Sequence, residues 1–326
     1  MKILNLCYTD MAGAAFTLSH AINKYTKHQA ISLRGQNNYL SYPAFAEMQD
    51  YNVDLCRKMV YNSDVIVFHT VVLPYLEGLG IDHERLKGKK LLVYFHGTEF
   101  RQIGDQLIEQ AQMLLGNPQF LVSTPDMMAL QKDVKWLPVC RSFSEISRRY
   151  GLCNQDRKAL DAFVVPKGKV VFTHAPTSEE KKGSAMFYRA ITKVIKELSY
   201  VSFLTIRNQP WFECLQHLRN VDVLFDCNPP FPFAYGAVSV EASIFKSAIV
   251  TKIDNDTIRR IKELTGLKSP FITFSDEADL TNKAFRLAED PELRRIFGGM
   301  AYKYCKAVHD EKPVAKRFMN ILESMD

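Results

Sequence analysis

Short, mostly apolar runs, each followed by a segment long enough for a helix, recur along this chain. Apolar runs of this kind are typical of strands buried on both faces, and helical spacers between them favour parallel βαβ units with right-handed crossovers. The first half therefore predicts a doubly wound parallel sheet. Its expected strands are Lys2–Tyr8, Ala30–Leu33, Val65–His69, Leu91–Phe95, Phe120–Ser123 and Val134–Leu137.

The same pattern restarts after Pro166 and Gly168, two residues that interrupt regular structure. Further strands are predicted at Val170–Thr173, Val201–Ile206, Val221–Phe225 and Ala248–Thr251. Helices are predicted at Ala14–Tyr25, Ser184–Leu198, Glu213–Arg219 and Ala237–Phe245, and from Pro291 onward with breaks at Gly298–Gly299 and His309–Pro313. The second half thus repeats the α/β pattern of the first.

A chain of 326 residues is long enough for two domains of about 150 residues each. The predicted division is a Rossmann-like domain over residues 1–165, a second over residues 166–305, and a helix over residues 306–326 that packs back on the first domain. The two doubly wound domains are expected to face a central cleft. Open α/β sheets bind ligands beyond the carboxyl ends of their strands, so site residues are sought in the loops after strands.

Composition excludes several classes of protein. The formal net charge of +6 is spread over both halves and does not indicate a dedicated nucleic-acid module. The seven cysteines are odd in number and lack metal-ligand spacing, so a cytoplasmic location and no metal site are expected. No apolar stretch approaches the roughly 20 residues that span a bilayer, and no signal-peptide pattern is present; peripheral membrane association stays open.

Two loops of the first half carry candidate site residues. Residues 9–13 (TDMAG) precede a helix whose amides attract anions, so Gly13 is a candidate for close approach to a phosphate, with a plain tight turn as the alternative. His96 ends a strand and opens the polar loop 96–101, where it can bond a sugar hydroxyl or move a proton. His69 also ends a strand. A structural histidine is the alternative for both.

In the second half, His174 ends a strand, and Lys181, Lys182 and Gly183 precede the next helix. A lysine there can reach a diphosphate while the glycine and the helix N-terminus supply backbone donors. The alternative is a solvated, charged loop.

Residues 234–242 (AYGAVSVEA) form the most informative segment. Tyr235 and Gly236 make a compact turn, and the helix that begins near Ala237 presents its N-terminal amides. Glu241 follows in an apolar stretch, where a buried carboxylate is costly unless it accepts hydrogen bonds. Two ribose hydroxyls would satisfy both oxygens; a capped or ion-paired glutamate is the alternative.

Together these segments resemble retaining glycosyltransferases of the GT-B architecture, close to the family-four type (group 1). The resemblance extends over most of the chain: the Gly13 loop, residues 95–97, residues 123–126 with 136–138, residues 174–176 with 182–183, and residues 235–236 with 241–242. It implies a hexosyl- or pentosyltransferase that moves a sugar from a nucleotide-diphosphate donor to an acceptor hydroxyl. The first domain would face the acceptor and the second would bind the donor, with no cofactor beyond this co-substrate.

The resemblance also assigns roles to residues. Lys182 matches the lysine that contacts the donor phosphates, His96 the histidine near the transferred sugar, and Glu241 the second glutamate of a Glu-(seven residues)-Glu motif, which holds the ribose. The predicted catalytic residues are therefore His96 and Lys182. The predicted donor-binding residues are Gly13, His174, Lys181, Lys182, Arg207, Tyr235, Gly236, Ala237 and Glu241.

Two positions depart from the family pattern. Phe233 stands where the first glutamate is expected, and His174 with the following alanine replaces the usual Gly-Arg pair. One phosphate-binding cation is therefore missing unless Lys181 or Arg207 supplies it.

Other functions fit the same residues. A nucleotide-sugar epimerase would share the fold, and a non-catalytic nucleotide-sugar-binding protein would tolerate Phe233. The acceptor also stays open between a glycan, a lipid-linked sugar and a modified DNA base, as in bacteriophage enzymes that glycosylate hydroxymethylated cytosine. Contacts with nucleic acid would make binding fall with added salt.

Overall fold

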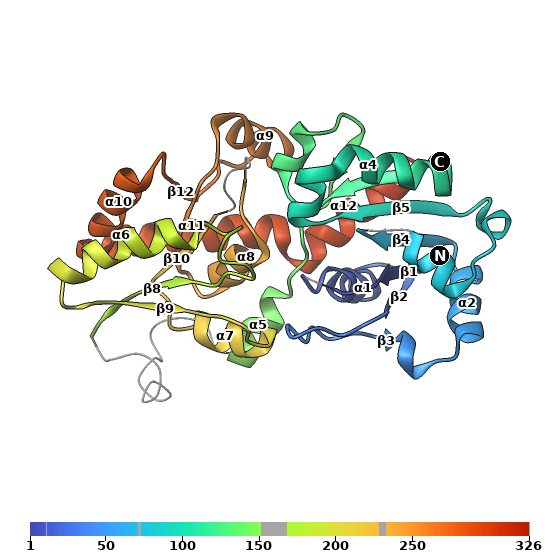
Figure 1. The fold of residues 1–326 in the computed structure, drawn as a ribbon, viewed down its shortest axis with the longest axis horizontal. Coiled ribbons are helices and arrows are strands. Elements are labelled where there is room, and N and C mark those ends of the chain that lie inside the picture. The colour runs from blue at the N-terminus through green and yellow to red at the C-terminus, as the bar shows by residue number, and fades with distance from the viewer. Residues whose placement is uncertain (11, 71–72, 151–167, 228–232, 326) are drawn as a thin grey trace. The chain divides into compact units, whose positions relative to one another are not determined.

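The computed structural model describes residues 1–10, 12–70, 73–150, 168–227 and 233–325, and the chain divides into two compact units. The first comprises Met1–Ser142 and His309–Asp326, and the second comprises Phe143–Val308. Each is built on a parallel sheet, which confirms the predicted pair of doubly wound α/β units (Figure 1). The predicted division between residues 165 and 166 lies outside the described residues, and the chain enters the second unit already at Phe143.

A seven-stranded parallel sheet forms the centre of the first unit, in the order β3-β2-β1-β4-β5-β6-β7. Its strands are β1 (Lys2–Cys7), β2 (Gln29–Arg34), β3 (Ala46–Glu47), β4 (Val65–His69), β5 (Lys90–Phe95), β6 (Gln119–Val122) and β7 (Val134–Trp136). The direction of winding reverses between β1 and β4. The loops at this reversal are therefore the expected place for a ligand in this unit.

Helices cover both faces of the first sheet: α1 (Ala14–Tyr25), α2 (Val53–Tyr61), α3 (Leu73–Leu79), α4 (Gly97–Leu115) and α12 (Glu311–Glu323). The blue α1 and the red α12 pack on each other and on one face of the sheet (Figure 1). Leu18 and Phe318 are buried in this contact, each worth about 2 kcal/mol of apolar burial. Lys24 and Glu311 pair at 2.8 Å across the two helices, so α12 is a component of the first unit.

The second unit contains a five-stranded parallel sheet in the order β12-β11-β10-β8-β9. Its strands are β8 (Val170–His174), β9 (Val201–Thr205), β10 (Val223–Asp226), β11 (Ala248–Thr251) and β12 (Ile272–Thr273). Winding starts at β8, moves outward to β9 and then returns to β10 on the other side. The reversal therefore lies between the neighbouring strands β8 and β10.

The helices of the second unit are α5 (Phe143–Tyr150), α6 (Ser184–Glu197), α7 (Trp211–Leu218), α8 (Ala237–Ile244), α9 (Asn255–Thr265), α10 (Glu277–Glu289) and α11 (Pro291–His309). The predicted break at Gly298–Gly299 is wrong, because α11 continues through both glycines. Gly298 instead lies against the carbonyl of Lys246, where an added Cβ would be 1.9 Å from the oxygen. None of the described helices is long and apolar enough to cross a membrane.

Candidate functional site

The reversal between β8 and β10 brings two polar residues together at the carboxyl edge of the second sheet. His174 is the last residue of β8, and Asp226 is the last residue of β10. The two strands are in register, with Phe225 opposite His174. Because parallel strands end at the same edge, the loops that follow both strands meet at this point.

Lys182 reaches the same point from the loop before α6. Its Nζ lies 3.2 Å from Oδ1 of Asp226 and 4.8 Å from the centre of the Phe233 ring. Asp226 is buried, whereas a fifth of the Lys182 side chain is exposed. The ammonium is therefore fixed by a carboxylate and an aromatic face and still accessible from outside, as a contact with an anion requires.

Asp226 was not predicted from the sequence. Besides Lys182, its carboxylate accepts hydrogen bonds from the backbone amide of Gly236 at 2.7 Å and from the hydroxyl of Ser239 at 2.8 Å. It thereby holds the N-terminal end of α8 against β10. A Cβ on Gly236 would lie 2.9 Å from Oδ2 of Asp226, so glycine is required by this close approach. The available signal was an acidic residue directly after an apolar run.

Glu241 lies on α8, on the buried side of the helix, as its apolar neighbours predicted. Its Oε1 accepts a hydrogen bond from the indole Nε1 of Trp211, the first residue of α7, at 2.8 Å. A protein donor thus serves one oxygen of the carboxylate that the family resemblance assigns to a ribose.

His174 and Tyr235 have their polar atoms engaged inside the second unit. His174 donates from Nδ1 to the carbonyl of Phe225 at 3.1 Å, and its Nε2 lies 2.8 Å from the hydroxyl of Ser184. Burial lowers the pKa of His174 to about 4, so the imidazole is neutral at pH 7. The Tyr235 hydroxyl meets that of Tyr304 at 2.9 Å. Both side chains support the loops of the site, and their hydrogen bonds inside the unit engage the polar atoms that a nucleotide-sugar would contact.

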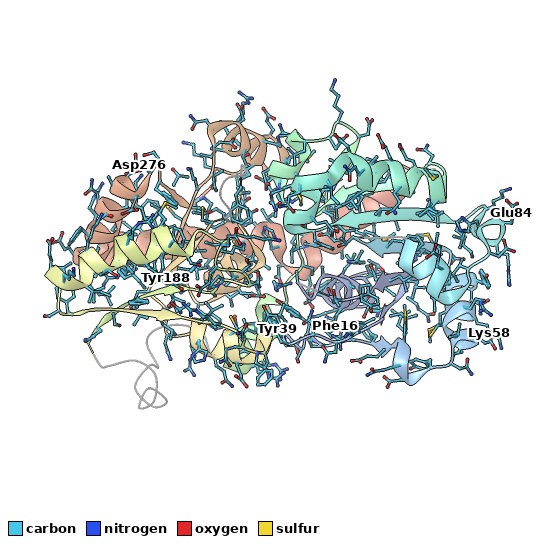
Figure 2. All side chains as sticks on the ribbon, viewed as in Figure 1. Phe16, Tyr39, Lys58, Glu84, Tyr188 and Asp276 are labelled. Carbon is cyan, nitrogen blue, oxygen red and sulfur yellow. The ribbon has the colours of Figure 1, made fainter. Side chains whose placement is uncertain are left out.

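The two candidate second cations lie at the rim of this region. Arg207 pairs with the exposed Glu179 at 2.5 Å and donates to the hydroxyl of Tyr188 at 2.8 Å. Tyr188, labelled in Figure 2, projects from α6. Lys181 is exposed beside Lys182. Arg207 would have to leave a solvent-screened ion pair to bind a phosphate, and such exposed pairs contribute little stability.

In the first unit, the loop that contains Gly13 also contains a buried carboxylate, that of Asp10. Asp10 is buried, and its carboxylate accepts hydrogen bonds from the amides of Ala15 at 3.3 Å and Phe16 at 3.1 Å. Two amides that the sequence offered to a phosphate are therefore bonded to the protein itself. Gly13 has φ of 60°, and an added Cβ would lie 2.4 Å from the Tyr42 ring, so its conformation and packing both require glycine.

His96 lies beside His69 at the carboxyl edge of the first sheet. Nε2 of His96 and Nδ1 of His69 are 3.0 Å apart, and the two rings stack with centroids 5.2 Å apart. Burial lowers the pKa of His96 to about 3 and that of His69 well below its usual value. Both imidazoles are therefore neutral at pH 7, which makes His96 a hydrogen-bonding group and not a stored proton.

The predicted residues thus fall into two groups. His174, Lys182, Gly236, Ala237 and Glu241 belong to the reversal in the second unit, with Arg207 and Lys181 at its rim, while Gly13 and His96 belong to the first unit. Among the described residues, no three histidine, cysteine, aspartate or glutamate side chains are grouped as a metal site would require.

Comparison with solved structures shows where this fold occurs. Over 99% of both chains, the protein superposes with a TM-score of 0.69 and 12% identity on an alpha-glucosyltransferase in complex with UDP and a 13-mer DNA containing a HMU base. A glycosyltransferase from Rickettsia africae gives a TM-score of 0.66 at 11% identity, covering 99% of this chain and 98% of that one. A putative UDP-N-acetylglucosamine 2-epimerase from Listeria monocytogenes gives 0.56 at 11% identity, covering 99% and 96%. No family model and no curated protein sequence matches the chain.

These similarities establish the fold over the full length of the chain. The first two neighbours are glycosyltransferases by name, and the fold agrees with the architecture expected from the sequence. At 11–12% identity they do not by themselves assign a reaction.

Proposed function

We propose that this protein is a glycosyltransferase that binds a UDP-linked sugar at the reversal between β8 and β10 and transfers the sugar to an acceptor hydroxyl. The observation that carries the proposal is the partly exposed Lys182 ammonium, 3.2 Å from Asp226 at the N-terminal end of α8. A fixed cation beside a helix N-terminus suits a diphosphate. The neighbouring alpha-glucosyltransferase structure, which contains UDP, supports the choice of nucleotide.

The chemistry follows from the charge that develops on the leaving group. As the bond between the anomeric carbon and the diphosphate oxygen breaks, the diphosphate gains negative charge, and Lys182 would stabilise it. The acceptor oxygen forms the new bond to the anomeric carbon, and the proton of its hydroxyl passes to an oxygen of the departing diphosphate, which leaves as UDP. We further propose that the configuration is retained and that no metal takes part, as the resemblance to the family-four type implies.

Asp226 holds the Lys182 ammonium in position before the donor binds. The carboxylate is buried and accepts hydrogen bonds from Gly236 and Ser239, so it stays in place when the ammonium contacts a phosphate. Phe233 presents its ring to Lys182 where the family has a carboxylate. We infer that Asp226 and Phe233 together orient the lysine.

A modified base in DNA is the acceptor we propose to test first. The neighbour with the TM-score of 0.69 contains DNA with a HMU base, and it covers this chain from end to end. The alternative acceptors are a glycan or a lipid-linked sugar. The alternative functions are an epimerase, which the Listeria neighbour favours, and a non-catalytic binding protein, which Phe233 favours.

A turnover assay separates these functions. The protein is incubated with UDP-glucose or UDP-N-acetylglucosamine alone, then with DNA containing hydroxymethylated pyrimidines or with a pool of glycans. We expect UDP release that depends on an acceptor and is lost in Lys182→Ala but kept in Lys193→Ala, whose exposed lysine on α6 pairs with Glu277 of α10. An epimer formed from the donor alone would establish an epimerase, and tight UDP-sugar binding without turnover would establish a binding protein.

A further inference from the structure

His96 is the last member of a hydrogen-bonded chain that begins inside the first unit. The Ser19 hydroxyl lies 2.9 Å from the carbonyl of Ala15, and the Asn5 amide nitrogen lies 2.8 Å from the Ser19 oxygen. Oδ1 of Asn5 lies 3.1 Å from Nε2 of His69, and Nδ1 of His69 lies 3.0 Å from Nε2 of His96. We call these four side chains, of Ser19, Asn5, His69 and His96, the His96 chain.

The direction of every hydrogen bond in the His96 chain follows from its first link. The Ala15 carbonyl can only accept, so the Ser19 hydroxyl donates to it and accepts from the amide nitrogen of Asn5. Asn5 therefore presents its oxygen to His69, and Nε2 of His69 must carry the hydrogen.

Each neutral imidazole carries one hydrogen, so Nδ1 of His69 is bare and accepts from His96. Nε2 of His96 then carries its hydrogen, and Nδ1 of His96 is bare. The reverse direction would place an N–H at Nδ1 of His96, and an unpaired buried N–H is rarer in proteins than an unpaired acceptor.

Nδ1 of His96 is buried and has no hydrogen-bond partner within the part of the chain that the structure describes. A buried acceptor without a partner is destabilising because it has lost its hydrogen bonds to water. The ring is held on two sides, by the stacked His69 and by Tyr94 with centroids 4.2 Å apart, so it is not free to turn this nitrogen away. The atom is therefore placed to receive a hydrogen bond from a group that the free protein lacks.

We infer that Ser19, Asn5 and His69 are positioning residues that fix His96 as the Nε2–H tautomer, so that its bare Nδ1 accepts a hydrogen bond from a hydroxyl of the bound sugar. A deprotonated phosphate or carboxylate oxygen has no hydrogen to offer and is rejected at this atom. Only the identity of the ligand rests on the proposed function; the tautomer belongs to the free protein.

Nitrogen-15 NMR of the imidazoles in the ligand-free protein tests the tautomer directly. We expect His69 and His96 to show a single Nε2–H pattern. His174 and His309 are internal references of opposite tautomer, because each donates from Nδ1 to a backbone carbonyl, of Phe225 and Val139 respectively. An Nδ1–H pattern for His96, or an average of both tautomers, would overturn the inference.

Two variants of His69 test the positioning role. His69→Gln keeps one donor and one acceptor and should preserve the single tautomer of His96, whereas His69→Phe should convert it to an averaged pattern. Asn5→Leu breaks the chain one link earlier and should have the same effect as His69→Phe. The unchanged signals of His174 and His309 report that both units stay folded. A single Nε2–H tautomer of His96 in folded His69→Phe and Asn5→Leu would refute the role of the chain.

Ligand titration then tests what meets Nδ1. UDP alone should leave the His96 Nδ1 signal in place, and UDP-glucose should shift it. A mixture of UDP and free glucose tests whether the hydroxyl belongs to the donor. If it does, the mixture should leave the Nδ1 signal in place as UDP alone does. In His69→Phe, the affinity for UDP-glucose should fall about tenfold while that for UDP stays the same. A shift of Nδ1 with UDP alone, or bound UDP-glucose without any shift, would contradict the hydroxyl contact.

Discussion

The Lys182 ammonium lies 3.2 Å from the Asp226 carboxylate, which also accepts the backbone amide of Gly236 at 2.7 Å. One buried carboxylate therefore fixes both the cation and the helix end that a diphosphate would contact. The relationship joins three segments that are far apart in the sequence: the loop before α6, the end of β10 and the start of α8. Its energetic and functional consequences are open to measurement.

The pair itself is the first prediction. Replacing Asp226 by Asn removes the negative charge and should lower the free energy of unfolding by about 3 kcal/mol, because Lys182 loses its partner and an amide donor then faces it. A double-mutant cycle with Lys182→Met should give a coupling energy of about 1–3 kcal/mol in urea unfolding. A coupling near zero would mean that the ion pair does not position the lysine.

Gly236 provides a steric test of the same site. The methyl group of Gly236→Ala would lie 2.9 Å from Asp226 and 3.6 Å from Lys182, so it should cost about 1–3 kcal/mol of stability and weaken UDP binding at least tenfold. The matched control is Gly299→Ala on α11, where nothing lies within 4 Å of the added carbon. The control should bind UDP normally and be up to about 1 kcal/mol more stable, because alanine favours helix. Equal effects of both substitutions on binding would count against the site.

Trp211 offers an optical signal for the ribose position. Its indole donates to Glu241, and the chain has only one other tryptophan, Trp136 in the first unit. A ribose that bonds to Glu241 should change the surroundings of the Trp211 indole. We expect UDP to produce a saturable change in fluorescence that persists in Trp136→Phe and disappears in Trp211→Phe. A change that persists in Trp211→Phe would place the nucleotide elsewhere.

The buried histidines predict how stability depends on pH. Burial lowers the pKa of His174 to about 4 in the folded protein, against about 6.5 in the unfolded chain. Between these values the unfolded chain binds more protons, so stability is full above pH 6.5 and is lost as the pH falls toward 4. His174→Asn, which keeps a donor for the Phe225 carbonyl, should reduce this loss by about 1 kcal/mol per pH unit near pH 5.5. Urea unfolding at pH 7 and pH 5.5 measures the loss of stability in each protein. An equal loss in the unaltered protein and in His174→Asn would contradict a neutral, buried His174.

Much of the fold could be predicted from the sequence because each buried parallel strand is a short run of apolar residues. The run at 65–69 appears unchanged as β4, and the run at 2–8 forms β1, which ends one residue earlier at Cys7. The order of the strands within each sheet follows from right-handed crossovers only once every strand is found, and the two-residue edge strands β3 and β12 carry too few residues for a pattern. The uninterrupted α11 was missed because the packing of Gly298 on Lys246 depends on a segment fifty residues away.

The candidate site could be predicted only in part, because some of its contacts join segments that are far apart in the sequence. Lys182, Gly236 and Glu241 stood out because each follows a strand or lies in an apolar helix. Asp226 did not, because an acidic residue directly after an apolar run is too weak a local signal to mark a site. The partners of Glu241 and His96, which are Trp211 and His69, are set by which strands and helices become neighbours. Such contacts across the chain cannot be derived from spacing.

Calorimetric titration of UDP and of uridine into the protein tests the central claim most directly. If a diphosphate contacts Lys182, UDP should bind and uridine should bind far more weakly. Lys182→Ala should weaken UDP about 10- to 100-fold, as expected for the loss of a charge-assisted hydrogen bond of roughly 1.5–3 kcal/mol, and Lys193→Ala should bind as the unaltered protein does. Equal affinity of the unaltered protein and Lys182→Ala for UDP, with both proteins folded, would contradict the account.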